Sequence, residues 1–233
     1  MTSDADEAAR ERAESESTVV SWFELFYDLV VVAAVSLCND EYLAHPSMST
    51  ALSALLGIAA LAWVWFMTTV FNNVFPGDDL IRRFLLLVQM AFIVVAALAV
   101  NQHRGLSNST GLVAYGAAIA IIGVLIVRET DGARRAKVVK GGVVTVGLTA
   151  LICVVGAALP INAAIVVSLA LVVSVGAALG ADLNDPKSAS MVRFDHIRER
   201  RGLFILIILG EGFASLVAAL HDLAPSHAAV FSY

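Results

Sequence analysis

Three acidic residues lie where an acid is costly, inside segments apolar enough to cross a membrane. Glu24 and Asp28 are four residues apart in SWFELFYDLVVVAAVSLC, and Glu211 lies in GLFILIILGEGFASLVAAL. On a helix, residues four apart share one face and differ in depth by about 6 Å. A charge near the bilayer centre costs at least about 2.5–3.5 kcal/mol on insertion scales. Acids in this position predict proton or cation handling.

The spacing of these acids indicates how they work together. If both were ionised, Glu24 and Asp28 would repel each other, so we expect one to stay protonated or a cation to lie between them. Asp28 and Glu211 each fall near the middle of an apolar segment, and both segments should run in the same direction. Small residues around Glu211, including Ser215, would let another helix approach closely. We therefore expect the first and last apolar segments to be neighbours.

Six residues form the predicted site for an ion, a proton or a substrate. They are Glu24, Asp28, Asn72, Asn73, Glu211 and Ser215. The two asparagines end the second apolar segment. The alternative is structural, because intramembrane polar groups also join helices or cap their ends.

Enzyme and metal chemistry have little support in this chain. We predict no catalytic residue, no metal site and no cofactor, since no nucleophile motif and no zinc-type Cys/His spacing occurs. Cys38 and Cys153 are expected to be small packing residues. No basic, aromatic patch indicates nucleic acid binding, so the expected partners are the lipid bilayer and a small ion or proton.

Composition determines which elements must position these residues. Apolar residues make up 59% of the chain and charged residues 15%, and the mean hydropathy is +0.82. A membrane-spanning helix needs about 20 mostly apolar residues. Seven such segments occur, at 19–38, 51–71, 84–102, 111–127, 141–159, 161–180 and 202–220. Long continuous apolar runs favour helices over a barrel.

The predicted fold is therefore all-α, a polytopic transmembrane helix bundle of about seven spans over residues 18–222. Residues 1–17 are expected to form a disordered acidic tail. Residues 223–233 are expected to be a second tail or the start of a further span.

The loop charges predict the orientation of the bundle. Of 15 Lys and Arg residues, all but Arg104 fall in the N-terminal segment and in alternate connections. The positive-inside rule then places the N-terminus in the cytoplasm and the C-terminus outside. In the connection at 72–83, Asp78 and Asp79 precede Arg82 and Arg83 by four residues. This spacing predicts a solvated cytoplasmic ion-pair cluster.

Three blocks of the sequence resemble the bacterial low temperature requirement A family. They are ELFYDLVVVAAV, WVWFMTTVFNNVFPGDDLIRRFLLLVQM and HIRERRGLFILIILGEGFASLVA. The first matches an ELFFDLVFV-like motif that includes Glu24 and Asp28. The last matches an ERFGLFxxIxLGE-like motif that ends at Glu211, with Arg201 where an aromatic residue is usual. The resemblance implies a multi-pass protein of the bacterial inner (plasma) membrane. It implies no substrate, and it suggests a shortened or incomplete chain because family members are usually longer.

Three functions remain open on the sequence. The first is a proton- or cation-linked transporter or channel, with Asp28 and Glu211 at mid-membrane and Glu24 as a cytoplasmic relay. The second is a non-transporting scaffold or sensor involved in cold adaptation. The third is an intramembrane enzyme acting on a lipid-linked substrate. The LF pairs that begin the first and last segments fit a parallel repeat, whose site would need pairing of chains as a homo-oligomer.

Overall fold

The described part of the chain is helical throughout apart from its short connections. The computed structural model describes residues 22–75, 77, 79–100, 108–129, 136–184, 202, 204–210, 213 and 217. The named helices are α2 (Trp22–Ala44), α3 (Met48–Val74), α4 (Leu80–Val100), α5 (Asn108–Arg128), α6 (Ala136–Ala158) and α7 (Ala163–Asn184). Residues 204–210 are helical as well.

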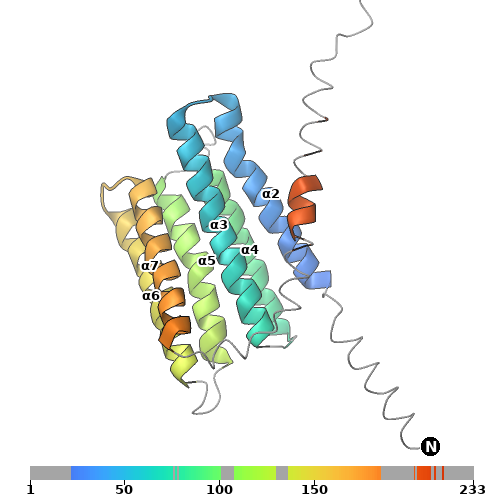
Figure 1. The fold of residues 1–233 in the computed structure, drawn as a ribbon, viewed down its shortest axis with the longest axis vertical. Coiled ribbons are helices and arrows are strands. Elements are labelled where there is room, and N and C mark those ends of the chain that lie inside the picture. The colour runs from blue at the N-terminus through green and yellow to red at the C-terminus, as the bar shows by residue number, and fades with distance from the viewer. Residues whose placement is uncertain are drawn as a thin grey trace, which may run out of the picture.

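The helices stand side by side as a bundle with antiparallel neighbours (Figure 1). Helix α2 packs against α3 and α4, and α5 lies between α4 and α6. Helix α7 packs against α6 and also reaches α3. This arrangement encloses one apolar core to which all six named helices contribute, mainly α2, α3, α4 and α5.

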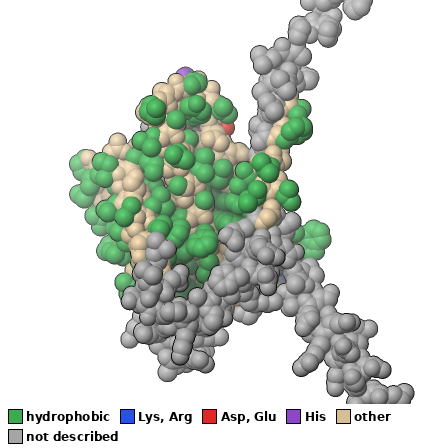
Figure 2. Space-filling model, in the orientation of Figure 1, with side chains coloured by type: hydrophobic (Ala, Val, Ile, Leu, Met, Phe, Trp, Pro, Cys, Tyr) green, Lys and Arg blue, Asp and Glu red, His purple; other side chains and the backbone are tan. Residues whose placement is uncertain are grey.

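The outer surface of the bundle is apolar. Figure 2 shows hydrophobic side chains across most of the visible described face. Leu55, Phe84 and Val172 are 63%, 64% and 69% exposed. A continuous apolar surface of this kind marks contact with lipid or a partner. Helices α2, α3, α4 and α5 are each long and apolar enough to cross a membrane, and α6 and α7 contain the apolar stretches Gly142–Ala158 and Ala163–Ala178. The all-helical membrane bundle expected from the sequence is confirmed.

The helices extend beyond several of the predicted apolar segments. Helix α3 covers 48–74 where 51–71 was expected, and α4 begins at Leu80 rather than at 84. Local capping explains the early start of α3. Ser47 Oγ accepts a hydrogen bond from the Thr50 amide at 3.1 Å, and Thr50 Oγ1 accepts one from the Ser47 amide at 3.0 Å. This reciprocal pair is a capping box. Much of the last predicted segment and both predicted tails lie outside the described residues.

The expected solvated ion-pair cluster between α3 and α4 is wrong for Arg82. Its side chain is 4% exposed. Nη1 donates to the Phe75 carbonyl at 2.6 Å, and Nη2 donates to Asn72 Oδ1 at 2.8 Å. The guanidinium also lies 4.7 Å from the centre of the Phe71 ring. The reason is that the last carbonyls of a helix have no partner within the helix. Arg82 supplies donors to the end of α3.

Asp79 pairs with a residue far away in the sequence. It accepts hydrogen bonds from both Nη atoms of Arg128 at the end of α5, with Nη1 3.2 Å from Oδ1. The two side chains are 42% and 34% exposed. The pair joins the α3–α4 connection to α5.

The Asp79–Arg128 pair predicts a pH-dependent contact. The hydrogen bond from Arg128 holds the pKa of Asp79 below its usual value. The pKa of Asp79 is lower in the folded protein than in the unfolded chain. The pair with Arg128 therefore contributes its full stabilisation above the unfolded-state pKa, and this stabilisation is lost as pH falls through the folded-state pKa. We expect Arg128→Gln to raise the pKa of Asp79 towards its usual value, as measured by NMR titration of the carboxyl carbon. High salt should produce part of the same rise, because it screens exposed pairs. An unchanged pKa in Arg128→Gln would contradict the assignment.

Helices α5 and α6 approach closely where glycines replace side chains. A Cβ atom at Gly116 would lie 3.0 Å from Cys153 Cβ and 3.3 Å from the Ala150 carbonyl oxygen. A Cβ atom at Gly123 would lie 2.9 Å from Val146 Cγ1. Small residues allow such backbone contact in membrane bundles. The α5–α6 pairing therefore depends on Gly116 and Gly123.

Enlarging Gly116 should separate α5 from α6. We expect Gly116→Leu to lower the free energy of unfolding by about 1–3 kcal/mol, the usual cost of overpacking. Thermal unfolding of the purified chain in detergent measures this change. Gly147→Leu on α6 is the matched control, because a Cβ atom at Gly147 meets no atom within 4 Å. Equal losses in the two variants would show that the close approach of α5 and α6 at Gly116 is not the cause of the cost.

Candidate functional site

Asp28 is buried inside the bundle and is held by a tryptophan from the next helix. Its side chain lies in the second turn of α2 and is 0% exposed. Trp65 Nε1 of α3 donates a hydrogen bond to Asp28 Oδ1 at 2.6 Å. The indole nitrogen is only a donor, so Asp28 Oδ1 is the acceptor of this bond. The packing of α2 against α3 thus places an acid among apolar helices with a fixed donor.

Three further polar side chains lie beside this pair. The Tyr27 hydroxyl donates towards Thr68 Oγ1 and Gln89 Oε1, both at 3.1 Å. Gln89 Nε2 donates to the Ala118 carbonyl at 2.9 Å. These contacts connect α2, α3, α4 and α5. We call Tyr27, Asp28, Trp65, Thr68 and Gln89 the polar core.

The polar core joins four helices of the bundle through buried hydrogen bonds. Tyr27 and the side chains of Thr68 and Gln89 are at most 1% exposed. A hydrogen bond between membrane helices contributes about 0.6 kcal/mol on average and up to about 1.7 kcal/mol. An unsatisfied polar group in the same place costs more. The four helices are therefore held in one relative arrangement by these contacts.

A row of buried polar residues leads away from Trp65 along α3. Thr69 and Asn73 follow Trp65 at intervals of four residues, so they lie on the same side of the helix. Their side chains are 1% and 6% exposed. Thr69 Oγ1 has no hydrogen-bond partner among the described residues. The row ends beside Asn72 and its bond to Arg82. We call Trp65, Thr69 and Asn73 the α3 polar row.

The structure describes four of the six predicted site residues, Glu24, Asp28, Asn72 and Asn73. Asp28 and Asn73 are both buried, and Asn72 binds the guanidinium of Arg82. Glu24 is half-buried in the first turn of α2, one turn before Asp28. Glu211 and Ser215 lie outside the described residues, so their part in the site stays a prediction.

The start of the last apolar segment reaches the same tryptophan. Phe204 stacks on the Trp65 ring with the ring centres 4.1 Å apart and an angle of 15° between the planes. Phe204 is itself 7% exposed. One face of the indole is therefore covered by the segment that continues to Glu211. The proximity of Asp28 and Glu211 remains a prediction.

Sequence reasoning missed the partners of Asp28. Trp65 is the partner of Asp28 that the sequence did not identify. The available signal was the position of Trp63 and Trp65 in the body of an apolar segment. Tryptophan in membrane proteins is otherwise enriched at the interfaces. A buried tryptophan usually has a hydrogen-bond acceptor for its N–H, and here Asp28 is that acceptor.

Removing the indole donor should destabilise the bundle. We expect Trp65→Phe to lower the free energy of unfolding by about 1–3 kcal/mol, because it leaves a buried acceptor without this hydrogen bond. Chemical unfolding in detergent micelles measures the loss. Trp63→Phe is the matched control on the same helix. The Trp63 side chain is only half-buried, and the centre of its ring lies 5.5 Å from the centre of the Phe66 ring. If both variants lost the same stability, the Asp28 contact would not be the cause.

Comparison with known proteins agrees with this architecture. Residues 19–232 match the family described as bacterial low temperature requirement A protein. An uncharacterized protein of Rhizobium meliloti (strain 1021) is 27% identical over 214 residues, which cover 84% of this chain and 50% of the relative. The chain thus spans about half the length of that relative. No solved structure matches significantly. Because the family match covers nearly the whole chain, the chain belongs to the bacterial low temperature requirement A family and is a membrane protein.

Proposed function

We propose that this protein is a proton- or cation-linked transporter or channel of the bacterial inner membrane, with Asp28 as its central binding group. The observation that carries the proposal is the placement of Asp28, 0% exposed and bonded to Trp65 within the polar core. An ionisable residue facing the interior of a membrane bundle is expensive and usually marks an ion or proton pathway. The N-terminus lies in the cytoplasm in this proposal.

The chemistry of the site suits reversible binding of a proton or a small cation by Asp28. The indole N–H of Trp65 donates a hydrogen bond to Asp28 Oδ1. A proton or a small cation on Asp28 would compete with that donor. Binding would then change the contact that joins α2 to α3. This gives the site a direct connection between occupancy and helix packing.

The α3 polar row supports a route between Asp28 and one end of the bundle. Thr69 and Asn73 place oxygen and nitrogen atoms at successive turns between Trp65 and the Arg82 contact. Glu24, one turn nearer the start of α2, is the proposed relay on the same side. Hard cations and protons both use oxygen ligands. In this proposal Glu211 completes the site from the last segment.

Flux measurements with Asp28→Asn test the proposal. We expect the purified wild-type chain in proteoliposomes to carry protons or monovalent cations, followed by an internal pH dye under an imposed potential. Asp28→Asn should reduce this flux by about 100-fold or more, because an amide cannot take up a proton at this position. The substitution keeps the shape of the side chain and an oxygen acceptor for Trp65.

Asp79→Asn is the matched control, since Asp79 is an exposed acid outside the helices. It should leave the flux unchanged. Each variant is first checked for folding by circular dichroism and size-exclusion chromatography. A folded wild type without flux, or a folded Asp28→Asn protein with full flux, would overturn the proposal. Loss of stability in Asp28→Asn without any wild-type flux would instead favour the non-transporting scaffold.

A further inference from the structure

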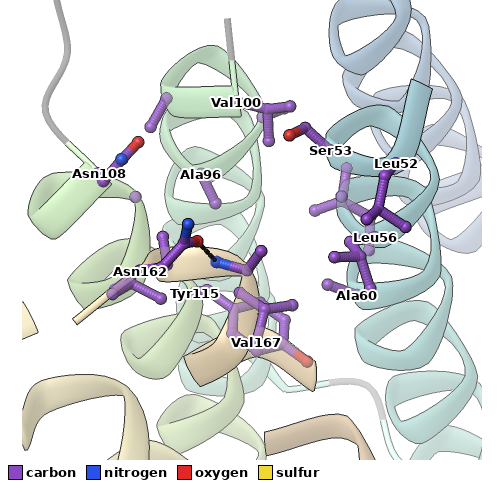
Figure 3. Close-up of a pocket in the computed structure, with 18 of the residues that line it drawn as sticks. Leu52, Ser53, Leu56, Ala60, Ala96, Val100, Asn108, Tyr115, Asn162 and Val167 are labelled. Atoms are coloured by element: carbon purple, nitrogen blue, oxygen red, sulfur yellow. Dashed lines mark hydrogen bonds between the residues drawn. The ribbon is translucent and has the colours of Figure 1, made fainter. Parts of the chain in front are cut away.

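A cavity lies at the opposite end of α3 from Asn73. It has a volume of about 380 Å³ and is lined by residues of α3, α4, α5 and α7. Figure 3 shows Leu56 and Ala60 on one side and Ala96 on the other, with Tyr115 and Val167 at the inner end. Cavities of this size that are mostly apolar with a few polar groups are typical of small-molecule sites.

The wall of the cavity is mostly apolar, and its small residues leave the space open. Ala60 and Ala96 end at Cβ and leave the space open, while Leu56 and Val167 supply methyl groups. Gly57 lets the helices come close, since a Cβ atom there would lie 3.0 Å from Val100 Cγ2. An unbranched hydrocarbon chain is the ligand shape that such a narrow apolar wall accommodates.

The rim of the cavity is polar and carries no charge among its described residues. Ser49 and Ser53 lie in the first turns of α3, Asn108 begins α5, and Asn162 precedes α7. These helix starts lie at the same end of the bundle, where a membrane helix passes from hydrocarbon to headgroups. Asn162 Oδ1 accepts the Ala164 amide at 2.8 Å (Figure 3), which fixes its place at the rim. Hydroxyl and amide groups here can bind ester or hydroxyl oxygens.

We propose that this cavity holds one acyl chain of a membrane glycerolipid, with the ester region of the lipid at the Ser49–Ser53–Asn108–Asn162 rim. The amphipathic order of the cavity, apolar inside and polar at the helix ends, matches the order of a lipid in the surrounding bilayer. Leu52 and Leu55, 53% and 63% exposed on α3, extend the apolar surface beside it. The site is separate from Asp28 and does not depend on transport.

Photolabelling tests the proposal with the full chain in vesicles. The vesicles contain phosphatidylethanolamine and phosphatidylglycerol with a trace of phosphatidylethanolamine that carries a diazirine on one acyl chain. Irradiation and tandem mass spectrometry then map the labelled residues. We expect label on Tyr115, which is only 4% exposed and is out of reach of lipid that merely surrounds the bundle. Unlabelled phosphatidylethanolamine should compete for this site.

A cavity-filling variant provides the decisive comparison. Ala60→Phe should reduce labelling of Tyr115 by about tenfold, because the new ring replaces the methylene contacts of the chain. Leu55→Phe, on the outward face of the same helix, should leave that labelling unchanged. If Ala60→Phe does not fold, Ala96→Leu fills the cavity from α4. No label on Tyr115 in the wild type, or label that persists in a folded filling variant, would overturn the proposal.

Discussion

The rest of the structure depends on the need to satisfy a buried acid in an apolar environment. Asp28 lies fully inside the bundle, and Trp65 reaches it from the neighbouring helix with a 2.6 Å hydrogen bond. In the lipid interior a polar group has no water to which it can hydrogen-bond, so its partner comes from the protein, here from another helix. This requirement fixes the rotation of α2 against α3. Tyr27 and Gln89 extend the same constraint to α4 and α5.

The outside and the inside of the bundle differ in the side chains that they carry. Outside, large apolar side chains such as Phe84 and Val172 face the surroundings, and at α5–α6 the glycines Gly116 and Gly123 let backbones touch. Inside, buried polar groups such as Asp28, Thr69 and Asn73 lie between the helices. Arg82 shows the structural use, since it supplies donors to the end of α3. The α3 polar row is where structure and the proposed ion route coincide.

The two proposed sites differ in chemistry because they occupy different depths. The polar core lies within the membrane-spanning part, where only protein groups can offer hydrogen bonds. The apolar cavity lies at helix ends, where hydrocarbon gives way to headgroups and an amphipathic ligand has a natural orientation. Phe204, stacked on Trp65, also links the last segment to the polar core. A movement of that segment would therefore act on the indole that binds Asp28.

The sequence by itself determined the class of protein, the helical segments and the unusual position of Asp28. Apolar runs of about 20 residues can satisfy their backbone in lipid only as helices. Asn73 could likewise be singled out as polar at the end of such a run. Tertiary structure alone decided that Trp65 binds Asp28, that Arg82 turns inward, and that Ala60 and Ala96 leave a cavity. Periodicity shows which residues share a face of one helix, but the partner depends on which faces of different helices meet.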